Sequence, residues 1–264
     1  MVDETKFLLW LLLLISASLC HASELDIQCL KSVQKSVVDP NGILRSSWKF
    51  NKNGRSGYIC GFTGVECWSH DENRVLSLRL RNLGLQGSFP QGLHDCTSMI
   101  ALDLSGNGFS GPIPWRIAHD APHLSYLDLS NNSFSGEIPD SIANMVYLNV
   151  LNLEYNQLDG QIPERFNALG RLTAFSVADN LLSGPVPALL RKFPASHFVG
   201  NRGLCGAPLD ECPGKIWGLV RIRQINDESS IGAAVGFVVG FVAAFYSPGW
   251  VVFSKRLRAY GFRV

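Results

Sequence analysis

The chain has 264 residues, a formal net charge of +1 and 46% hydrophobic residues. A chain of this length holds one ordinary domain with additional segments, and its apolar content suits a buried core. The net charge is too small to give an electrostatic reason for a nucleic-acid partner.

The N-terminus carries the pattern of a secretory signal peptide. An apolar run over residues 7–19 is too short to span a bilayer; Lys6 precedes it, and Cys20-His21-Ala22 follows it as a small-x-Ala cleavage site. We therefore expect residues 1–22 to be removed and the remaining chain to enter an oxidising compartment, in which disulfides form.

The next segment, residues 24–39, reads ELDIQCLKSVQKSVVD and has its apolar residues at helical spacing. Pro40-Asn41-Gly42 then ends the pattern. The segment predicts a short amphipathic helix that covers the open end of the following repeats. It belongs to a predicted N-terminal cap over residues 23–74. The apolar positions are Leu25, Cys29, Leu30, Val33 and Val37.

Two cysteine pairs with the same six-residue gap flank the centre of the chain, namely Cys60 with Cys67 and Cys205 with Cys212. The ends of a stack of repeats expose an apolar interior and need a lid, whereas zinc sites favour shorter gaps between ligands. The pairs therefore predict a disulfide in each cap. Cys96 falls at an apolar position, which favours a buried free thiol, although a bridge to Cys29 is left open.

One phrase recurs five times over residues 75–187, most clearly as LSYLDLSNNSFSGEIP from Leu124. Its first apolar residue returns about every 24 residues, the period of a leucine-rich repeat. The predicted fold is a leucine-rich-repeat solenoid with a short parallel sheet and an irregular or 3-10 helical convex side. Its repeats occupy residues 75–198, and a C-terminal cap occupies residues 199–213. The other four copies begin at Val75, Met99, Leu148 and Leu172.

Within each repeat, given positions carry given residue types, and each type has its own structural role. Apolar residues at the first, fourth, sixth and eleventh places point inward, and the alternation between them makes a short strand. The ninth place holds an Asn whose amide can satisfy buried backbone groups of neighbouring coils. The first repeat has Leu83 there, so we expect the ladder to start one coil late. The Asn residues are Asn107, Asn132, Asn156 and Asn180.

The phrase LxxLxLxxNxLxGxIP resembles the plant extracellular form of the leucine-rich repeat. DPNGILRSSW with CGFTGVEC, and GNRGLCGAPLDEC from Gly200, resemble the N- and C-terminal caps of plant leucine-rich-repeat receptors. More narrowly, QCLKS, YICGFTGVECW and DENRVLSLRL are similar to the ectodomains of inactive receptor-like kinases that interact with somatic-embryogenesis-type co-receptor kinases. The chain departs from that group because its sequence contains no kinase domain. Its layout is similar to that of kinase-lacking receptor-like proteins.

Residues 231–253, IGAAVGFVVGFVAAFYSPGWVVF, carry no charge and are long enough to cross a bilayer. Residues 214–230 form the linker before this predicted transmembrane helix, and residues 254–264 form a cytoplasmic tail. The sequence thus predicts a single-pass type I protein of the plasma membrane with extracellular repeats. Small residues at four-residue spacing favour helix packing in the membrane. They are Gly232, Gly236, Gly240 and Ala244.

No pattern of catalytic, cofactor-binding or metal-binding residues stands out, so we expect a protein that is not an enzyme and holds no cofactor. Gly106-Asn-Gly-Phe-Ser-Gly111 matches a dinucleotide fingerprint, but Pro112 follows at once where a helix must begin, and its glycines fill ordinary repeat positions. His70-Asp71-Glu72 is interpreted as a solvated loop. Asn131-Asn132-Ser133 is the only N-x-S/T sequon and marks Asn131 as a candidate glycosylation site.

The outward strand residues form the concave surface on which solenoids usually bind partners. Tyr126 and Tyr155 are the expected contact anchors, although Arg79 and Asp103 have a competing interpretation as an ion pair across adjacent strands. The predicted partner is a receptor or co-receptor kinase ectodomain, or a ligand shared with one, in plant signalling. An inhibitor of a cell-wall hydrolase and a shortened product of a receptor-like kinase gene are the alternatives. The predicted contact residues are Arg79, Arg81, Asp103, Tyr126, Asp128, Asn152, Glu154 and Tyr155.

Overall fold

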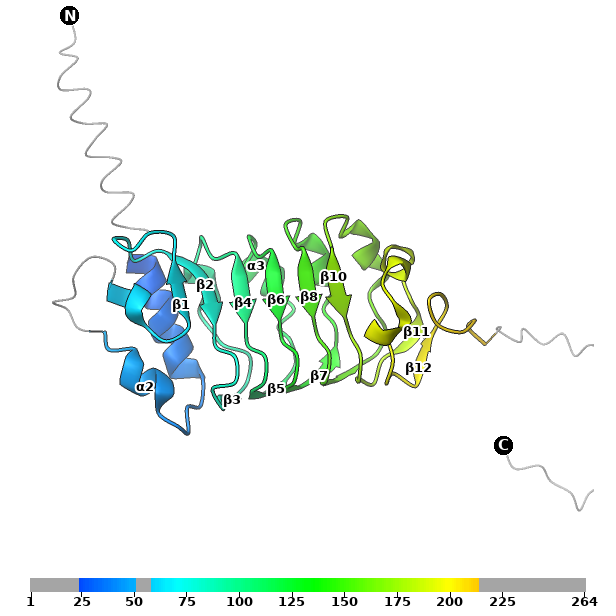
Figure 1. Ribbon diagram of the computed structural model, residues 1–264, viewed down its shortest axis with the longest axis horizontal. Coiled ribbons are helices and arrows are strands. Elements are labelled where there is room, and N and C mark those ends of the chain that lie inside the picture. The colour runs from blue at the N-terminus through cyan, green and yellow to red at the C-terminus, as the bar shows by residue number, and fades with distance from the viewer. Residues whose placement is uncertain (1–23, 51–57, 214–264) are drawn as a thin grey trace, which may run out of the picture. The chain divides into compact units, whose positions relative to one another are not determined.

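The computed structural model describes residues 24–50 and 58–213, which form a stack of coils with a cap at each end (Figure 1). The predicted signal peptide, the predicted membrane span over residues 231–253 with its row of small residues, and the predicted tail lie outside the described residues. Within the described ranges, no helix has the length and apolar character needed to cross a membrane.

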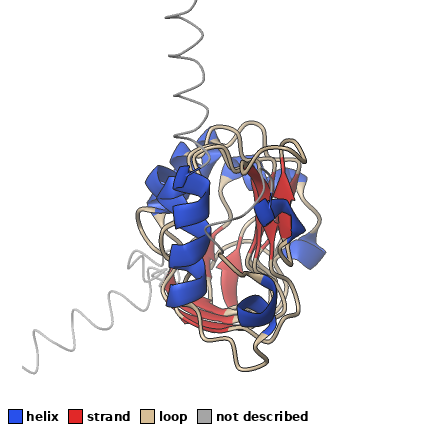
Figure 2. Ribbon diagram, turned by 90° about the vertical axis from the view of Figure 1, so that its left-hand side faces the viewer, coloured by secondary structure: helices blue, strands red, loops and turns tan. Residues whose placement is uncertain are grey.

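The N-terminal cap begins with the predicted helix, which covers residues 24–36 and lies across the end of the stack (Figure 2). Cys29, Leu30 and Val33 are fully buried on the side that faces the first coil, as expected from their spacing. Three short elements complete the cap: helix α2 (Ile43–Ser47), the 3-10 helix η1 (Tyr58–Gly61) and strand β1 (Val65–Cys67).

The first sheet has six strands in the order β1-β2-β4-β6-β8-β10, and every pair is parallel except β1 with β2. Each repeat supplies one strand, and the leucines predicted to point inward are buried. In the third repeat Leu124, Leu127, Leu129 and Phe134 are all fully buried. The strands are β2 (Val75–Arg79), β4 (Ala101–Asp103), β6 (Tyr126–Asp128), β8 (Val150–Asn152) and β10 (Ala174–Ser176).

A second parallel sheet was not predicted. It runs in the order β3-β5-β7-β9, and β11 pairs with β12 further along, so strands lie on two sides of the coil (Figure 2). The residues after each ladder position are extended and bond to the next coil, so the convex side is less irregular than expected. These strands are β3 (Gln86–Gly87), β5 (Gly108–Gly111), β7 (Ser133–Glu137), β9 (Gln157–Asp159), β11 (Ser183–Pro185) and β12 (Gly203–Cys205).

Short helices connect the second sheet to the next strand of the first sheet, as the prediction of 3-10 turns on this side requires. In three repeats the Pro at the sixteenth place, namely Pro139, Pro163 and Pro187, lies directly before the first helical residue. The helices are η2 (Leu93–Asp95), α3 (Ile117–Asp120), η3 (Asp140–Asn144), η4 (Glu164–Ala168) and η5 (Ala188–Lys192), with η6 (Ala195–His197) in the approach to the C-terminal cap.

The asparagine ladder has the predicted geometry. Asn156 Nδ2 donates to the carbonyl oxygens of Leu129 and Leu153, at 3.0 and 3.1 Å, and Asn156 Oδ1 accepts from the Phe134 amide at 3.0 Å. The Phe134 amide would otherwise be a buried donor without a partner, whereas each carbonyl also accepts from a neighbouring ladder residue, Leu129 from Asn132 and Leu153 from Asn180. The ladder starts at Asn107, whose Oδ1 accepts from the Leu83 amide of the first repeat at 3.1 Å.

The ladder also continues one coil beyond the prediction. Asn201 Nδ2 donates to the carbonyl oxygens of Val177 and Phe198, at 2.8 and 3.0 Å, and Asn201 Oδ1 accepts from the Leu182 amide. Asn201 follows Asn180 by 21 residues, so a search with the longer repeat period misses it. The C-terminal cap is therefore built as a shortened sixth coil.

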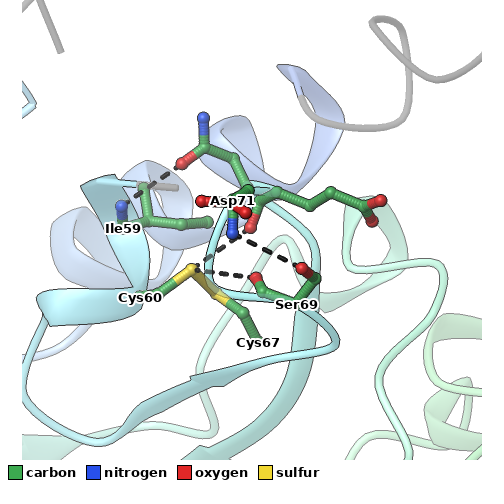
Figure 3. The surroundings of a disulfide bond; sticks show 7 residues. Ile59, Cys60, Cys67, Ser69 and Asp71 are labelled. Carbon is green, nitrogen blue, oxygen red and sulfur yellow. Dashed lines mark hydrogen bonds between the residues drawn. A yellow bond between two sulfur atoms is a disulfide. The ribbon is translucent and has the colours of Figure 1, made fainter. Parts of the chain in front are cut away.

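Both predicted cap disulfides are present, between Cys60 and Cys67 and between Cys205 and Cys212. Figure 3 shows the first, which ties η1 to β1; beside it, the Ile59 amide donates to Asn73 Oδ1 at 3.3 Å. The carbonyl oxygen of Glu72 lies 3.2 Å from Cys60 Sγ. The bridge and these contacts hold the loop that contains the exposed residues His70, Asp71 and Glu72.

The interpretation of Cys96 as a free thiol was wrong, because Cys29 and Cys96 form a third disulfide across a sequence separation of 67. The first helix carries Cys29 on its buried face, and Cys96 directly follows η2 on the first coil. The two Cα atoms are 5.5 Å apart, within the usual range for a disulfide. This bridge fastens the N-terminal cap to the first repeat.

Candidate functional site

The concave surface is formed by the strand residues that point away from the core, and the strand register brings the predicted column together. Arg79 lies opposite Asp103, Asp103 opposite Asp128, and Asp128 opposite Asn152. Most of these side chains have internal partners, and this decides how much of the surface is free for binding.

The alternative to a partner-binding role for Arg79 was an ion pair with Asp103 on the adjacent strand. Arg79 does not form this pair. Instead its Nε lies 3.5 Å from Glu66 Oε2. The antiparallel pairing of β1 with β2 places Glu66 opposite Ser77, which lies two residues before Arg79 on the same strand. The two charged side chains are 57% and 50% exposed, so solvent screening keeps the pair weak, at about 0–1 kcal/mol.

The two aspartates of the column shape the turn that follows their strands. Asp103 Oδ1 accepts from the amide and the hydroxyl of Ser105, at 3.0 and 2.6 Å. Asp128 Oδ1 accepts from the same groups of Ser130, at 2.9 and 2.7 Å. Such local bonds are typical of Asp at the start of a turn, so one oxygen of each carboxylate has a structural role.

Tyr126 is half-buried two residues before Asp128 on the same strand, and its hydroxyl donates to Asp128 Oδ2 at 3.2 Å. Burial raises the pKa of Tyr126 to about 12, and the negative charges of Asp128 and Asp103 add to the effect. The phenol is therefore a neutral hydrogen-bond donor at physiological pH. It lies in a hollow of about 440 Å³ that Arg81, Asp103, Asp128 and Asn131 also line. We call this the concave hollow.

Tyr155, by contrast, is a 53% exposed side chain at the eighth place of its repeat. Its backbone has a φ of 54°, in the left-handed region, where the other repeats have Asn82, Gly106, Asn131 and Asp179. Asn, Asp and Gly adopt this conformation readily, whereas a bulky aromatic residue does so under strain. The predicted residues Asn152 and Glu154 have side chains of intermediate burial. Asn152 Nδ2 approaches Asp128 Oδ2 at 3.4 Å, and Glu154 accepts from the Ser176 hydroxyl at 2.8 Å.

A second surface was not predicted. It is a groove of about 400 Å³ at the opposite ends of the same strands, and we call it the edge groove. Its residues come from the N-terminal cap and from the positions just before and after the first apolar residue of each repeat. They are Trp68, Arg74, Thr97, Ser98, Ile100, His123, Ser125, Tyr147, Asn149 and Arg171.

Aromatic and cationic side chains alternate along the edge groove. The guanidinium of Arg74 lies 5.3 Å from the centre of the Trp68 ring, and that of Arg171 lies 5.8 Å from the centre of the Tyr147 ring. The His123 and Tyr147 rings are 5.9 Å apart. Cation–π contacts of this kind restrain both partners.

Hydrogen bonds fix the cap end of the edge groove. Trp68 Nε1 donates to the Ser98 carbonyl at 3.1 Å, and Arg74 Nε donates to the Ser98 hydroxyl at 2.9 Å. Trp68 and Tyr147 nevertheless remain 49% and 45% exposed. Exposed aromatic rings that are already restrained lose little freedom on binding, which suits them to a protein interface.

The sequence contained a signal for this groove. The residue directly before the first apolar position forms a column of the same period as the leucines, and in the five repeats it is Arg74, Ser98, His123, Tyr147 and Arg171. The predicted contact residues all lie in the strand columns and the turn that follows them, and this column lies at the other end of the strands. The contribution of Trp68 depends on how the cap folds against β2, which the repeat pattern does not describe.

The described residues offer no site for metal chemistry, because no three His, Cys, Asp or Glu side chains among them gather closely enough to hold an ion. The rejected dinucleotide match at Gly106 to Gly111 contains the ladder residue Asn107 and ends in strand β5, not in a helix. A phosphate therefore meets no helix N-terminus there.

Comparison with known proteins agrees with the architecture. The family model described as Leucine Rich Repeat matches residues 98–119, 123–145 and 147–169, and that described as Leucine rich repeat N-terminal domain matches residues 23–68. A probably inactive leucine-rich repeat receptor-like protein kinase of Arabidopsis thaliana is 52% identical over 218 residues, which is 80% of this chain and 35% of that protein. A probable inactive receptor kinase of the same plant is 56% identical over 207 residues. The chain spans about a third of the length of these curated relatives.

Two solved structures are similar over nearly their whole length. The crystal structure of the BIR2 ectodomain from Arabidopsis thaliana is 46% identical, with a TM-score of 0.69, and the match covers 71% of this chain and 98% of that one. A chain in the crystal structure of the BIR3–SERK2 complex from the same plant is 44% identical, with a TM-score of 0.68 and the same coverage. Cap, repeats and cap thus agree in sequence and in structure, and the chain belongs to the family of leucine-rich-repeat ectodomains of inactive plant receptor-like kinases such as BIR2.

Proposed function

We propose that this chain is a non-enzymatic cell-surface protein of plants whose repeats bind the ectodomain of a receptor or co-receptor kinase and thereby regulate its signalling. The observation that carries the proposal is the edge groove, in which Trp68 and Tyr147 are exposed yet held in place by Arg74 and Arg171. Large restrained aromatics and arginines are the side chains that most often carry binding energy at protein interfaces.

The solved complex supports the class of partner. BIR3 was crystallised with SERK2, and a chain of that structure matches this one over 98% of its length. Transfer of the partner from one ectodomain to another is part of the proposal. A membrane anchor over residues 231–253 is a further part, and it would hold the groove in the same plane as a membrane-bound kinase and raise their effective concentration.

The edge groove is the principal contact surface in this proposal, and the concave face is secondary. Asp103 is buried, Tyr126 is half-buried, and Arg79 is paired with Glu66. Arg81 and Tyr155 are exposed as well. The groove also presents Arg171 and Tyr147 together, which suits a partner that offers carboxylates and aromatic rings.

The test is capture of partners from plant membranes with the full chain, beside a variant with Tyr147→Ala and Arg171→Ala. We expect the unaltered chain to recover a receptor kinase and the variant to lose it. A matched variant with Arg81→Ala and Tyr155→Ala should retain it. Recovery of a cell-wall hydrolase without any receptor kinase would overturn the proposal in favour of an inhibitor.

A further inference from the structure

The sequon Asn131-Asn132-Ser133 lies at the end of the third inner strand, where its two asparagines have different roles. Asn132 is a ladder residue that donates to the carbonyl oxygens of Leu104 and Leu129, at 2.9 and 3.1 Å. Asn131 makes no such bond through its side chain and is exposed. The side-chain nitrogen of Asn131 is therefore available for modification, while the neighbouring ladder residue Asn132 keeps the backbone at Asn131 in place.

The described chain has the chemistry of a secreted protein. It contains three disulfides, two of them in the N-terminal cap region and one in the C-terminal cap. Disulfides of this number persist in oxidising compartments, which a protein reaches through the secretory route. The same route adds glycans to Asn in an N-x-S/T sequon, and this sequence has one.

The position of Asn131 connects the sequon with two features that the proposed function does not use. Asn131 lines the concave hollow, in which Tyr126 and Asp128 lie. It is also next to Tyr155 of the following coil, because the Asn132 amide donates to the Tyr155 carbonyl at 3.1 Å. Neighbouring strands are about 4.8 Å apart, so a sugar on Asn131 comes within reach of the exposed Tyr155 side chain.

We propose that Asn131 carries an N-linked glycan that stands over the concave hollow and packs against Tyr155. The strained aromatic residue then has a role, since its ring gives the sugar an apolar face to cover. The glycan closes this part of the concave surface to protein partners. The edge groove stays open, because His123 and Ser125 precede strand β6 whereas Asn131 follows it.

The experiment compares three full-length proteins expressed through the plant secretory route: the unaltered chain, Ser133→Ala and Ser133→Thr. The first substitution removes the sequon and keeps Asn131, and the second keeps the sequon. Peptide N-glycosidase in heavy-oxygen water converts a glycosylated Asn131 to a labelled Asp, which peptide mass spectrometry detects. Hydroxyl-radical labelling of the untreated proteins then measures the accessibility of Tyr155, with Tyr147 in the edge groove as the internal control.

We expect labelled Asp at position 131 in the unaltered chain and in Ser133→Thr, and none in Ser133→Ala. Labelling of Tyr155 should rise at least three-fold in Ser133→Ala, while Tyr147 stays unchanged. Unmodified Asn131 in the unaltered chain would overturn the assignment of the site. A modified Asn131 with equal Tyr155 labelling in all three proteins would overturn the shielding. Neither measurement involves a partner, so either failure is distinct from a failure of the proposed function.

Discussion

Asp26 gives the sharpest test of the energetics of the N-terminal cap. Its side chain is fully buried, and neither carboxylate oxygen has a hydrogen-bond partner among the described residues. Burial raises the pKa of Asp26 from 3.8 to about 7, and the nearby Val75 amide and Arg74 charge lower it without offsetting burial. The Val75 amide therefore lowers the pKa of Asp26 from a distance greater than that of a hydrogen bond.

The direction of the pH dependence follows from this shift. The folded state holds the proton more tightly than the unfolded state, so the stabilisation is complete below pH 3.8 and is lost as the pH rises to about 7. A difference of about three pKa units corresponds to about 4 kcal/mol at 1.36 kcal/mol per unit. Between pH 5 and pH 8, the loss from this one group is about 3 kcal/mol.

The perturbation is Asp26→Asn, which keeps the shape of the side chain and removes its titration. Urea unfolding with the disulfides intact measures the free energy of unfolding of both proteins between pH 5 and pH 8. The difference between the two proteins cancels the titration of other groups. We expect that difference to shift by about 3 kcal/mol in favour of the variant as the pH rises. A difference that stays constant over this range would refute the reasoning, whatever the absolute stability of the variant.

Three further predictions concern the coils and their fastening. Asn156→Ala leaves the buried Phe134 amide without a partner, while the Leu129 and Leu153 carbonyls keep Asn132 and Asn180 as donors; it should cost about 1–3 kcal/mol in urea unfolding, whereas Ala at the exposed Asn144 should cost less than about 0.5 kcal/mol. Replacing both Cys29 and Cys96 with Ser opens a loop of 67 residues and should cost about 4 kcal/mol, against about 2 kcal/mol for the separation of 7 between Cys60 and Cys67; equal losses of thermal stability would contradict this order. Tyr155→Asn should relieve the left-handed strain and raise the stability of protein without glycans by about 1 kcal/mol, and a lower melting temperature would count against it.

The sequence predicted the parts of the fold that repeat. Inward leucines such as Leu127 and ladder residues such as Asn156 are specified within one repeat and its neighbours, so periodicity locates them. The close cysteine pairs are local for the same reason. The Cys29–Cys96 bridge depends on how the first helix packs across the first coil, which no local pattern records.

The candidate site was predicted less well, and the reason is again physical. The strand register places Arg79, Asp103 and Asp128 in one column, as predicted. The hydrogen bonds of Asp103 and Asp128 depend on the turns that follow their strands. The partner of Arg79 depends on the position of β1, which carries Glu66. The edge groove combines a column of repeat residues with Trp68 from the cap. A surface made by two differently built parts of a chain is not contained in the pattern of either part.

The central claim is that the edge groove binds a kinase ectodomain. The most direct test is the dissociation constant of the full chain, purified in detergent, for the SERK2 ectodomain by calorimetry, with and without Tyr147→Ala and Arg171→Ala. If the two interface anchors together contribute about 2 kcal/mol or more to the binding free energy, their loss makes binding at least about 30-fold weaker. The same affinity for the variant, or a comparable loss on changing Arg81 and Tyr155 alone, would contradict the account.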